Sequence, residues 1–172
     1  MTMSSRNKIP NVFPAWLSSA LFLYSPLNST HGKEHRNECS PGSAVPGDLE
    51  VAVRHLPSGE VIKTDAPTDN GGRGAHFSPT DLLAAGLSAC VLTIMGLVAK
   101  RENIPFADAR IEIEKQMQDT PRRIGRLTMT IHMPAGLSQA QKEKFERAAD
   151  LCPVKKSLHE AIEVTFEFRY PD

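Results

Sequence analysis

Cysteine and aromatic residues are scarce in this chain, and its charges cancel. Three cysteines among 172 residues are too few, and odd in number, for the disulfide frameworks of small secreted domains. Twenty Lys and Arg residues balance twenty Asp and Glu residues, so no overall field attracts nucleic acid or an anionic membrane. The CxxC, CxxH and HExxH spacings of common zinc sites do not occur. We therefore expect no metal, no other cofactor and no nucleic-acid partner.

The first 46 residues differ in composition from the rest. An apolar stretch over residues 12–27 is interrupted by prolines, and no clear small-residue cleavage site follows it, so it matches a secretory signal only weakly. A stretch rich in Pro, Gly and Ser then covers residues 40–47. We expect a poorly ordered N-terminal extension over residues 1–46 and one domain over residues 47–172. An export signal and a misassigned start codon are the alternatives.

Alternation of apolar and polar residues predicts β-strands on both sides of a long apolar segment. Residues 49–55 and 60–64 alternate around a Pro-Ser-Gly turn and indicate a hairpin. Residues 109–114 and 124–133 alternate in the same way and indicate a second antiparallel hairpin with one wet face. A last alternating segment over residues 163–170 closes the chain as a strand.

The segment between the hairpins is predicted to be a long, buried helix. Ser78 is suited to cap it, Pro79 to occupy its first turn, and Asp81 to complete a capping box. Residues 82–99 then form a run of eighteen without a charge, which is long enough for a membrane span. Because the run holds four alanines and two glycines, we favour a buried core helix over a span.

The remaining segments complete an α+β fold. The glycine-rich loop at residues 68–75 lacks the spacings of nucleotide-binding loops, so we expect a flexible connection with several residues at positive φ. Ser138 caps a second, amphipathic helix, which Cys152-Pro153 ends, and residues 154–159 can form a short helical turn. The order is two strands, helix, two strands, helix, strand, which predicts an α+β architecture with antiparallel sheet.

Two of the cysteines lie in regular segments. Cys90 falls in the middle of the uncharged run, where a free cysteine commonly packs as a small hydrophobe. Cys152 lies close to Lys155 and Lys156, whose charges favour the thiolate, the nucleophilic form. A peroxide-reducing cysteine requires access, a lowered pKa and a second thiol that traps its sulfenic acid. The residues alone leave a packing role and a reactive role open for Cys90.

The motifs around these cysteines occur together in a known family. They read Asp69-Asn70-Gly71-Gly72, then Phe77-Ser78-Pro79-Thr80-Asp81-Leu82-Leu83-Ala84-Ala85-Gly86-Leu87-Ser88-Ala89-Cys90, and finally Cys152-Pro153-Val154-Lys155-Lys156-Ser157-Leu158. With the strands and helix between them in the expected order, residues 48–170 resemble the OsmC/Ohr family of thiol-dependent peroxidases, in particular its OsmC-like branch.

The resemblance implies a fold and a reaction. The fold is a homodimer in which antiparallel sheets wrap two long central helices. Cys90 is implied as the peroxidatic nucleophile and Cys152 as the resolving thiol, and a lipoyl-type dithiol would regenerate the pair. Organic hydroperoxides would be reduced to alcohols in the response to oxidative stress. We expect a cytoplasmic antioxidant oxidoreductase with no membrane partner.

The chain departs from the family pattern near the reactive cysteine. Well-studied branches of the family pair that cysteine with an arginine from the N-terminal region and carry a glutamate where Thr80 stands. Arg36 and Arg54 are the substitutes that this sequence offers for the arginine. A second hypothesis follows from the departures. The protein is then a non-catalytic relative that binds a small apolar ligand at the dimer interface.

Overall fold

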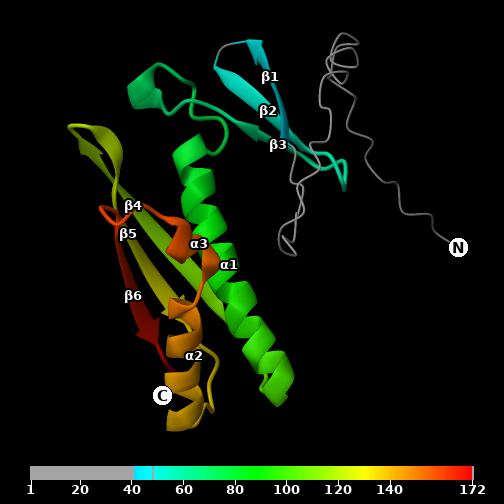
Figure 1. Cartoon of the computed structure of the whole chain (residues 1–172), viewed down its shortest axis with the longest axis vertical. Helices are drawn as coiled ribbons and strands as arrows, with labels where there is room; N and C mark the ends of the chain where they lie inside the picture. The colour runs from blue at the N-terminus through cyan, green and yellow to red at the C-terminus, as the bar shows by residue number, and fades with distance from the viewer. Residues whose placement is uncertain (1–40, 48, 172) are drawn as a thin grey trace, which may run out of the picture. The chain divides into compact units, whose positions relative to one another are not determined.

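The computed structural model describes residues 41–47 and 49–171. The chain divides into two compact units, residues 1–63 and residues 64–172, and each unit is described by itself. Figure 1 shows the elements of both units with their labels.

The first unit contains a three-stranded sheet. Strands β1 (Pro41–Gly47), β2 (Glu50–His55) and β3 (Val61–Thr64) lie in the order β1-β2-β3. The predicted hairpin of β2 and β3 is confirmed. Strand β1 pairs antiparallel with β2, although residues 41–46 fall within the stretch that we expected to be a poorly ordered extension. Its pairing uses backbone groups, which the Pro- and Gly-rich composition does not reveal. The rest of the expected extension lies outside the described residues.

Helix α1 (Pro79–Glu102) is the long element of the second unit. Its predicted capping box is confirmed, since the Ser78 N–H donates to Asp81 Oδ2 at 2.9 Å and the Asp81 N–H donates to Ser78 Oγ at 3.1 Å. One face is buried, at positions three or four residues apart: Ala84, Leu87, Val91, Met95 and Ala99. The opposite face keeps Leu83 and Leu97 exposed. The burial expected for this helix is therefore one-sided.

Helix α1 is also the one described helix that is long and apolar enough to cross a membrane. Only 28% of its most apolar eighteen-residue window is buried within the chain. Core helices of globular proteins have the same length and composition.

The second unit has its own three-stranded sheet, of strands β4 (Arg110–Asp119), β5 (Arg122–His132) and β6 (Glu163–Arg169) in the order β4-β5-β6. Strands β4 and β5 pair antiparallel, as predicted. Strand β6 pairs parallel with β5, which corrects the expectation of a purely antiparallel sheet. The physical reason is the helical segment between β5 and β6, because a helical crossover returns the chain to the starting end of the sheet.

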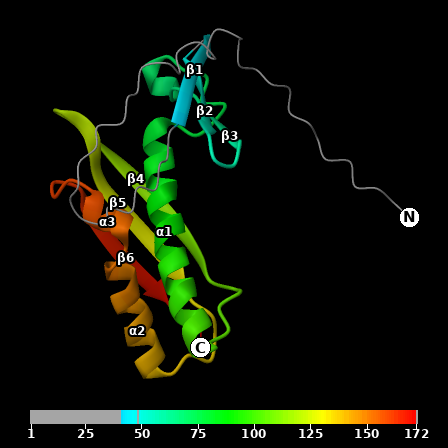
Figure 2. The same ribbon diagram turned by 45° about the vertical axis from the view of Figure 1, so that its right-hand side comes forward.

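That crossover contains α2 (Gln139–Asp150) and α3 (Pro153–Ser157). Ser138 caps α2 in a capping box with Gln141, as predicted for this serine. Helices α1 and α2 cover the same face of the sheet (Figures 1 and 2), and α1 contacts both α2 and α3. The core of this unit therefore lies between these helices and the sheet.

Strand β5 supplies the sheet side of that core. Leu127, Met129 and Ile131 are fully buried at alternate positions, which confirms the predicted apolar face. They pack with the buried Phe145 of α2 and the buried face of α1. A bulge shifts the register of β4 and β5 between Gln116 and Met117. On one side of the bulge the buried residue of β5 is the even-numbered Ile124, whereas the buried residues on the other side are odd-numbered.

Candidate active site

The two cysteines singled out by sequence lie together in the second unit. Cys90 is half-buried in the middle of α1 and packs against the core. Cys152 is fully buried (0% exposed) where α2 ends and α3 begins. The Cys90 thiol lies close enough to the Cys152 thiol to change its pKa. Both are free cysteines, so the site is a dithiol at the contact of α1 and α3.

Local sequence explains why Cys152 faces α1. The α2 helix ends at Asp150, and Pro153 starts α3 two residues beyond Leu151. Because a residue before proline avoids helical geometry, Cys152 takes an extended-type ψ of 120° between the helices. Its thiol consequently enters the core, whereas Leu151 beside it is 69% exposed.

Burial raises the pKa of the Cys152 thiol, and the neighbouring Cys90 thiol raises it further. The backbone N–H groups of Lys155 and Val154 act in the opposite direction but do not outweigh these two causes. The sequence argument that nearby lysines favour a Cys152 thiolate is therefore wrong. The structure shows why for Lys155, whose Nζ lies 2.6 Å from Asp150 Oδ1 and 4.3 Å from the centre of the Phe166 ring.

A charged cluster at the start of α1 was not found from the sequence. Lys115 of β4 places its Nζ 2.5 Å from Asp81 Oδ1 and 2.8 Å from Thr80 Oγ1. Burial raises the pKa of Asp81, but hydrogen bonds from Lys115 and Ser78 outweigh it and leave that pKa lowered. One signal was available, because Lys115 follows Ile111 and Ile113 in the apolar register of its strand.

The Lys115 cluster bears on Thr80, where the resemblance implies a glutamate. The Thr80 hydroxyl oxygen accepts a hydrogen bond from the ammonium group of Lys115, whereas a glutamate at this position could pair with an arginine. Thr80 lies ten residues before Cys90, about 15 Å along a helix, so the cluster is remote from the thiols within one chain. Of the two arginines considered as substitutes, Arg54 lies on β2 in the first unit. Arg36 lies outside the described residues, as does the third cysteine, Cys39.

The loop before α1 is built around a buried carboxylate. Asp65 is 1% exposed, and its Oδ2 accepts a hydrogen bond from the Ala75 N–H at 3.1 Å. That hydrogen bond is the main cause that lowers the pKa of Asp65. Gly71 and Gly74 have φ values of 78° and 62°, which confirms the predicted positive φ. The glycine-rich loop that was expected to be flexible is therefore anchored at Ala75 by its hydrogen bond to Asp65, near the start of the second unit.

Together, these features define a class of protein, an α+β fold that carries a dithiol between its long helix and a short one. The family model described as OsmC-like protein matches residues 71–167. The chain belongs to the OsmC-like protein family. The matched region contains Cys90, Cys152 and the Lys115 cluster.

Relatives and solved structures agree with this family. The chain is 32% identical over 109 residues to an uncharacterized protein of Acinetobacter baylyi, covering 62% of this chain and 76% of the relative. It is 31% identical over 108 residues to the organic hydroperoxide resistance protein-like 2 of Staphylococcus epidermidis, covering 59% and 74% of the two chains.

Among solved structures, one from Psychrobacter arcticus is 38% identical with a TM-score of 0.73. It is described as a candidate osmotic stress induced and detoxification response protein, and the match covers 75% of this chain and 94% of that one. The organic hydroperoxide resistance protein OhrB of Bacillus subtilis is 21% identical with a TM-score of 0.54, covering 76% and 98%. That second likeness shows a shared fold.

Proposed function

We propose that this protein is a hydroperoxide reductase that uses Cys90 and Cys152 to reduce organic hydroperoxides to alcohols. The observation that carries the proposal is the contact between the two thiols inside an OsmC-like fold. A sulfenic acid on one sulfur then has a second thiol beside it, which is the arrangement that prevents overoxidation. A relative with a hydroperoxide resistance name supports the substrate class.

The difference in burial between the two cysteines supports the roles that we propose for them. Cys90 is half-buried, whereas Cys152 is fully buried with a raised pKa, so Cys90 is the thiol that a peroxide reaches. The Cys90 thiolate attacks the terminal peroxide oxygen, the O–O bond breaks, and the alkoxide leaves as an alcohol after it takes a proton. The Cys152 thiol then gives up its proton and attacks the sulfenic sulfur. A Cys90–Cys152 disulfide forms, and water leaves.

A dithiol of the lipoyl type closes the cycle in this proposal. One of its thiols opens the Cys90–Cys152 disulfide, and the other releases the mixed disulfide as a cyclic product. A dithiol suits the Cys90–Cys152 disulfide because its second thiol attacks the mixed disulfide within the same reductant molecule. We place this reaction in the cytoplasm, where reduced dithiols are maintained.

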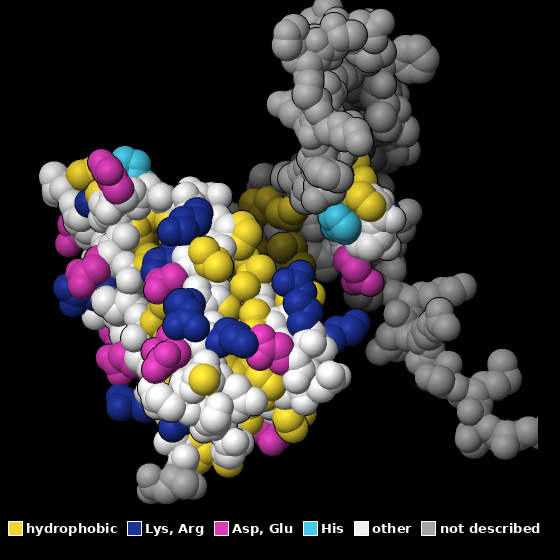
Figure 3. Space-filling model, turned by 60° about the horizontal axis from the view of Figure 1, so that its bottom comes forward, with side chains coloured by type: hydrophobic (Ala, Val, Ile, Leu, Met, Phe, Trp, Pro, Cys, Tyr) yellow, Lys and Arg dark blue, Asp and Glu magenta, His cyan; other side chains and the backbone are white. Residues whose placement is uncertain are grey.

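We further propose that the active protein is a homodimer through α1. Leu83 and Leu97 are 39% and 45% exposed on a face of α1 that the described residues of its own unit leave uncovered. A second copy with the same face would bury both side chains in a self-complementary contact. Charge does not dictate another partner, because basic and acidic side chains are interspersed on the surface in Figure 3.

Stopped-flow mixing of the reduced protein with cumene hydroperoxide tests the reaction. We expect rapid loss of two thiols per chain in the wild-type protein and in Cys39→Ser, which is the matched control. Cys90→Ser should lose the fast phase, and Cys152→Ser should keep it while forming a sulfenic acid that dimedone traps. A wild-type rate in Cys90→Ser would overturn the proposal.

The Lys115 cluster supports a second candidate function, binding of a small apolar ligand at the dimer interface without catalysis. Thr80 is bound to Lys115 and lacks the charge of the glutamate that the resemblance implies. This candidate predicts that an apolar ligand raises the melting temperature equally in the wild-type protein and in Cys90→Ser. Loss of that rise in Cys90→Ser would count against it.

A further inference from the structure

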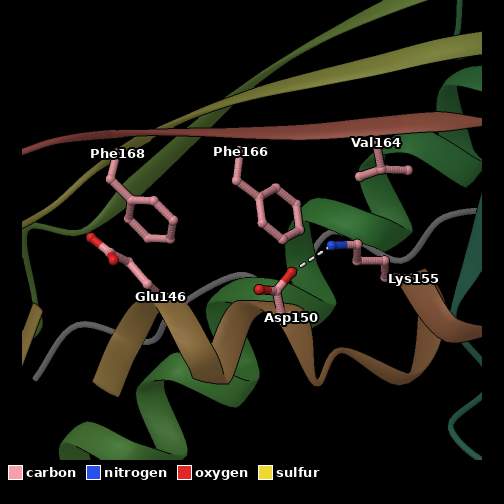
Figure 4. Close-up of a pocket in the computed structure, with 6 residues that line it drawn as sticks. All are labelled: Glu146, Asp150, Lys155, Val164, Phe166 and Phe168. Atoms are coloured by element: carbon pink, nitrogen blue, oxygen red, sulfur yellow. Dashed lines mark hydrogen bonds and ion pairs between the residues drawn. The ribbon is translucent and has the colours of Figure 1, made fainter. Parts of the chain in front are cut away.

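A hollow of about 350 Å³ lies between strand β6 and the two short helices of the second unit. Its lining residues are Val164, Phe166, Phe168, Glu146, Asp150 and Lys155. Figure 4 shows the three apolar side chains pointing from β6 toward the helices and the three charged side chains pointing back toward them. Neither thiol lines it, so its chemistry is separate from that of the proposed reaction.

The floor of the hollow belongs to a row of three aromatic rings. Phe166 and Phe168 occupy alternate positions on one face of β6, and Tyr170 follows directly after the strand ends. The Phe168 and Tyr170 rings stack with their centres 6.1 Å apart. Lys155 Nζ lies 4.3 Å from the centre of the Phe166 ring, and Lys142 Nζ lies 4.6 Å from that of Tyr170. The outer rings of the row thus already attract cations. Among the described residues, no such cation lies over Phe168.

Two carboxylates of α2 face this row of rings, Glu146 next to Phe168 and Asp150 next to Phe166 (Figure 4). Glu146 and Asp150 are one turn apart on α2 and so share a face. Glu146 Oε1 accepts a hydrogen bond from the Tyr170 hydroxyl at 2.8 Å, and Asp150 Oδ1 accepts one from Lys155 at 2.6 Å. Each carboxylate keeps a second oxygen that can accept from a ligand. Two carboxylates and one ammonium give the lining a formal charge of minus one, which a single monovalent cation balances.

We propose that this hollow binds a small primary alkylammonium ion. The ammonium group donates hydrogen bonds to Glu146 and Asp150, and the adjoining methylene groups lie on the Phe168 ring. A carboxylate or phosphate ligand would be repelled by the same two side chains. A calcium or magnesium ion would require more oxygen ligands than a floor of aromatic rings supplies.

The direct test is a titration of the ¹⁵N-labelled full-length protein with n-butylammonium chloride at constant ionic strength. We expect saturable NMR shifts at the amides of Glu146, Asp150 and Phe168 in the millimolar range, where a contact of this size belongs. The ligand's methylene protons should shift upfield in the ring current of Phe168. n-Butanol, which has the same shape without the charge, should produce neither effect.

Variants separate this site from general attraction of cations. Glu146→Gln keeps an acceptor for Tyr170 and should weaken binding about tenfold, as loss of one charged partner does. Phe168→Leu keeps an apolar floor and should weaken it about threefold. Glu143→Gln, on α2 but paired with Arg147 outside the hollow, is the control and should bind like the wild type. Absence of saturation, equal binding of n-butanol or an equal loss in Glu143→Gln would overturn the proposal.

Discussion

The thiol of Cys152 lies against that of Cys90, yet the two differ in access, because Cys152 is fully buried and Cys90 only half-buried. In a pair of this kind the more accessible thiol meets a substrate first, and the buried thiol reacts most readily with its neighbour. The burial that separates the roles also raises the pKa of Cys152. In the reaction that we propose, the raised pKa keeps the Cys152 thiol protonated until a sulfenic acid forms beside it.

The raised pKa predicts slow alkylation of Cys152. In Cys90→Ser, iodoacetamide should modify Cys152 more slowly than free cysteine at every pH, because burial continues to disfavour the thiolate. The rate should climb only above the ordinary thiol pKa of about 8.5. Mass spectrometry of quenched samples measures it. Alkylation of Cys152 as fast as free cysteine at neutral pH would show that the thiol is neither buried nor suppressed.

The Asp81–Lys115 pair predicts an acid-sensitive contribution to stability. Since the folded-state pKa of Asp81 is lowered, its contribution is present above the unfolded-state pKa of about 3.9. It is lost as pH falls through the lower folded-state value. Lys115→Met should therefore destabilise the protein near neutral pH and show a smaller further loss below about pH 4. Urea unfolding at a series of pH values measures both effects.

The control for this prediction is Lys144→Met. Lys144 pairs with Glu102, and its side chain is 43% exposed against 18% for Lys115, so its removal should cost only about 0.2–1 kcal/mol. If Lys115→Met kept the full acid dependence of the wild-type protein, the Asp81 pair would not be its source.

The loop before α1 predicts a steric effect at Gly72. A Cβ atom there would lie 1.8 Å from the carbonyl oxygen of Ala66, so backbone has to move. Gly72→Ala should destabilise the protein by about 1–3 kcal/mol, as overpacking does. Gly125→Ala meets the Gln118 Cβ at 3.3 Å, a milder contact, and should cost less. Thermal unfolding ranks the two variants, and the reverse order would contradict the loop geometry.

The exposed face of α1 predicts the oligomeric state. Leu97→Asp places a charge in the proposed dimer contact and should convert a dimer to a monomer in light scattering after gel filtration. Leu151→Asp is the matched control, because Leu151 is 69% exposed at the end of α2 and not on α1. It should leave the dimer intact. A monomeric mass for the wild-type protein in the same measurement would contradict the proposed dimer.

Much of the fold was readable because local rules determined it. The capping boxes of Ser78 and Ser138, the alternation along β5 and the break at Cys152-Pro153 each depend on neighbouring residues. The parallel pairing of β6 was missed because its direction depends on the crossover and not on the strand's own pattern. Strand β1 was missed because its backbone pairing is independent of side-chain pattern.

For the site, the sequence predicted the two cysteines but not their environment. The contact of Cys90 with Cys152 depends on the packing of α1 against α3, which periodicity does not report. The pKa of Cys152 was predicted in the wrong direction, because nearness to Lys155 in sequence says nothing of where its ammonium group points. The Lys115 cluster joins residues more than thirty positions apart, although a lone lysine in an apolar register was a usable signal.

Peptide mapping after one equivalent of cumene hydroperoxide tests the central claim most directly. The reduced protein is oxidised, unreacted thiols are blocked with iodoacetamide, and the digest is analysed by mass spectrometry without reduction. We predict that Cys90 and Cys152 appear in one disulfide-linked peptide pair while Cys39 is alkylated. If Cys90 and Cys152 were both recovered alkylated after the peroxide had been consumed, or if Cys90 were linked to Cys39, the proposed pair would be contradicted.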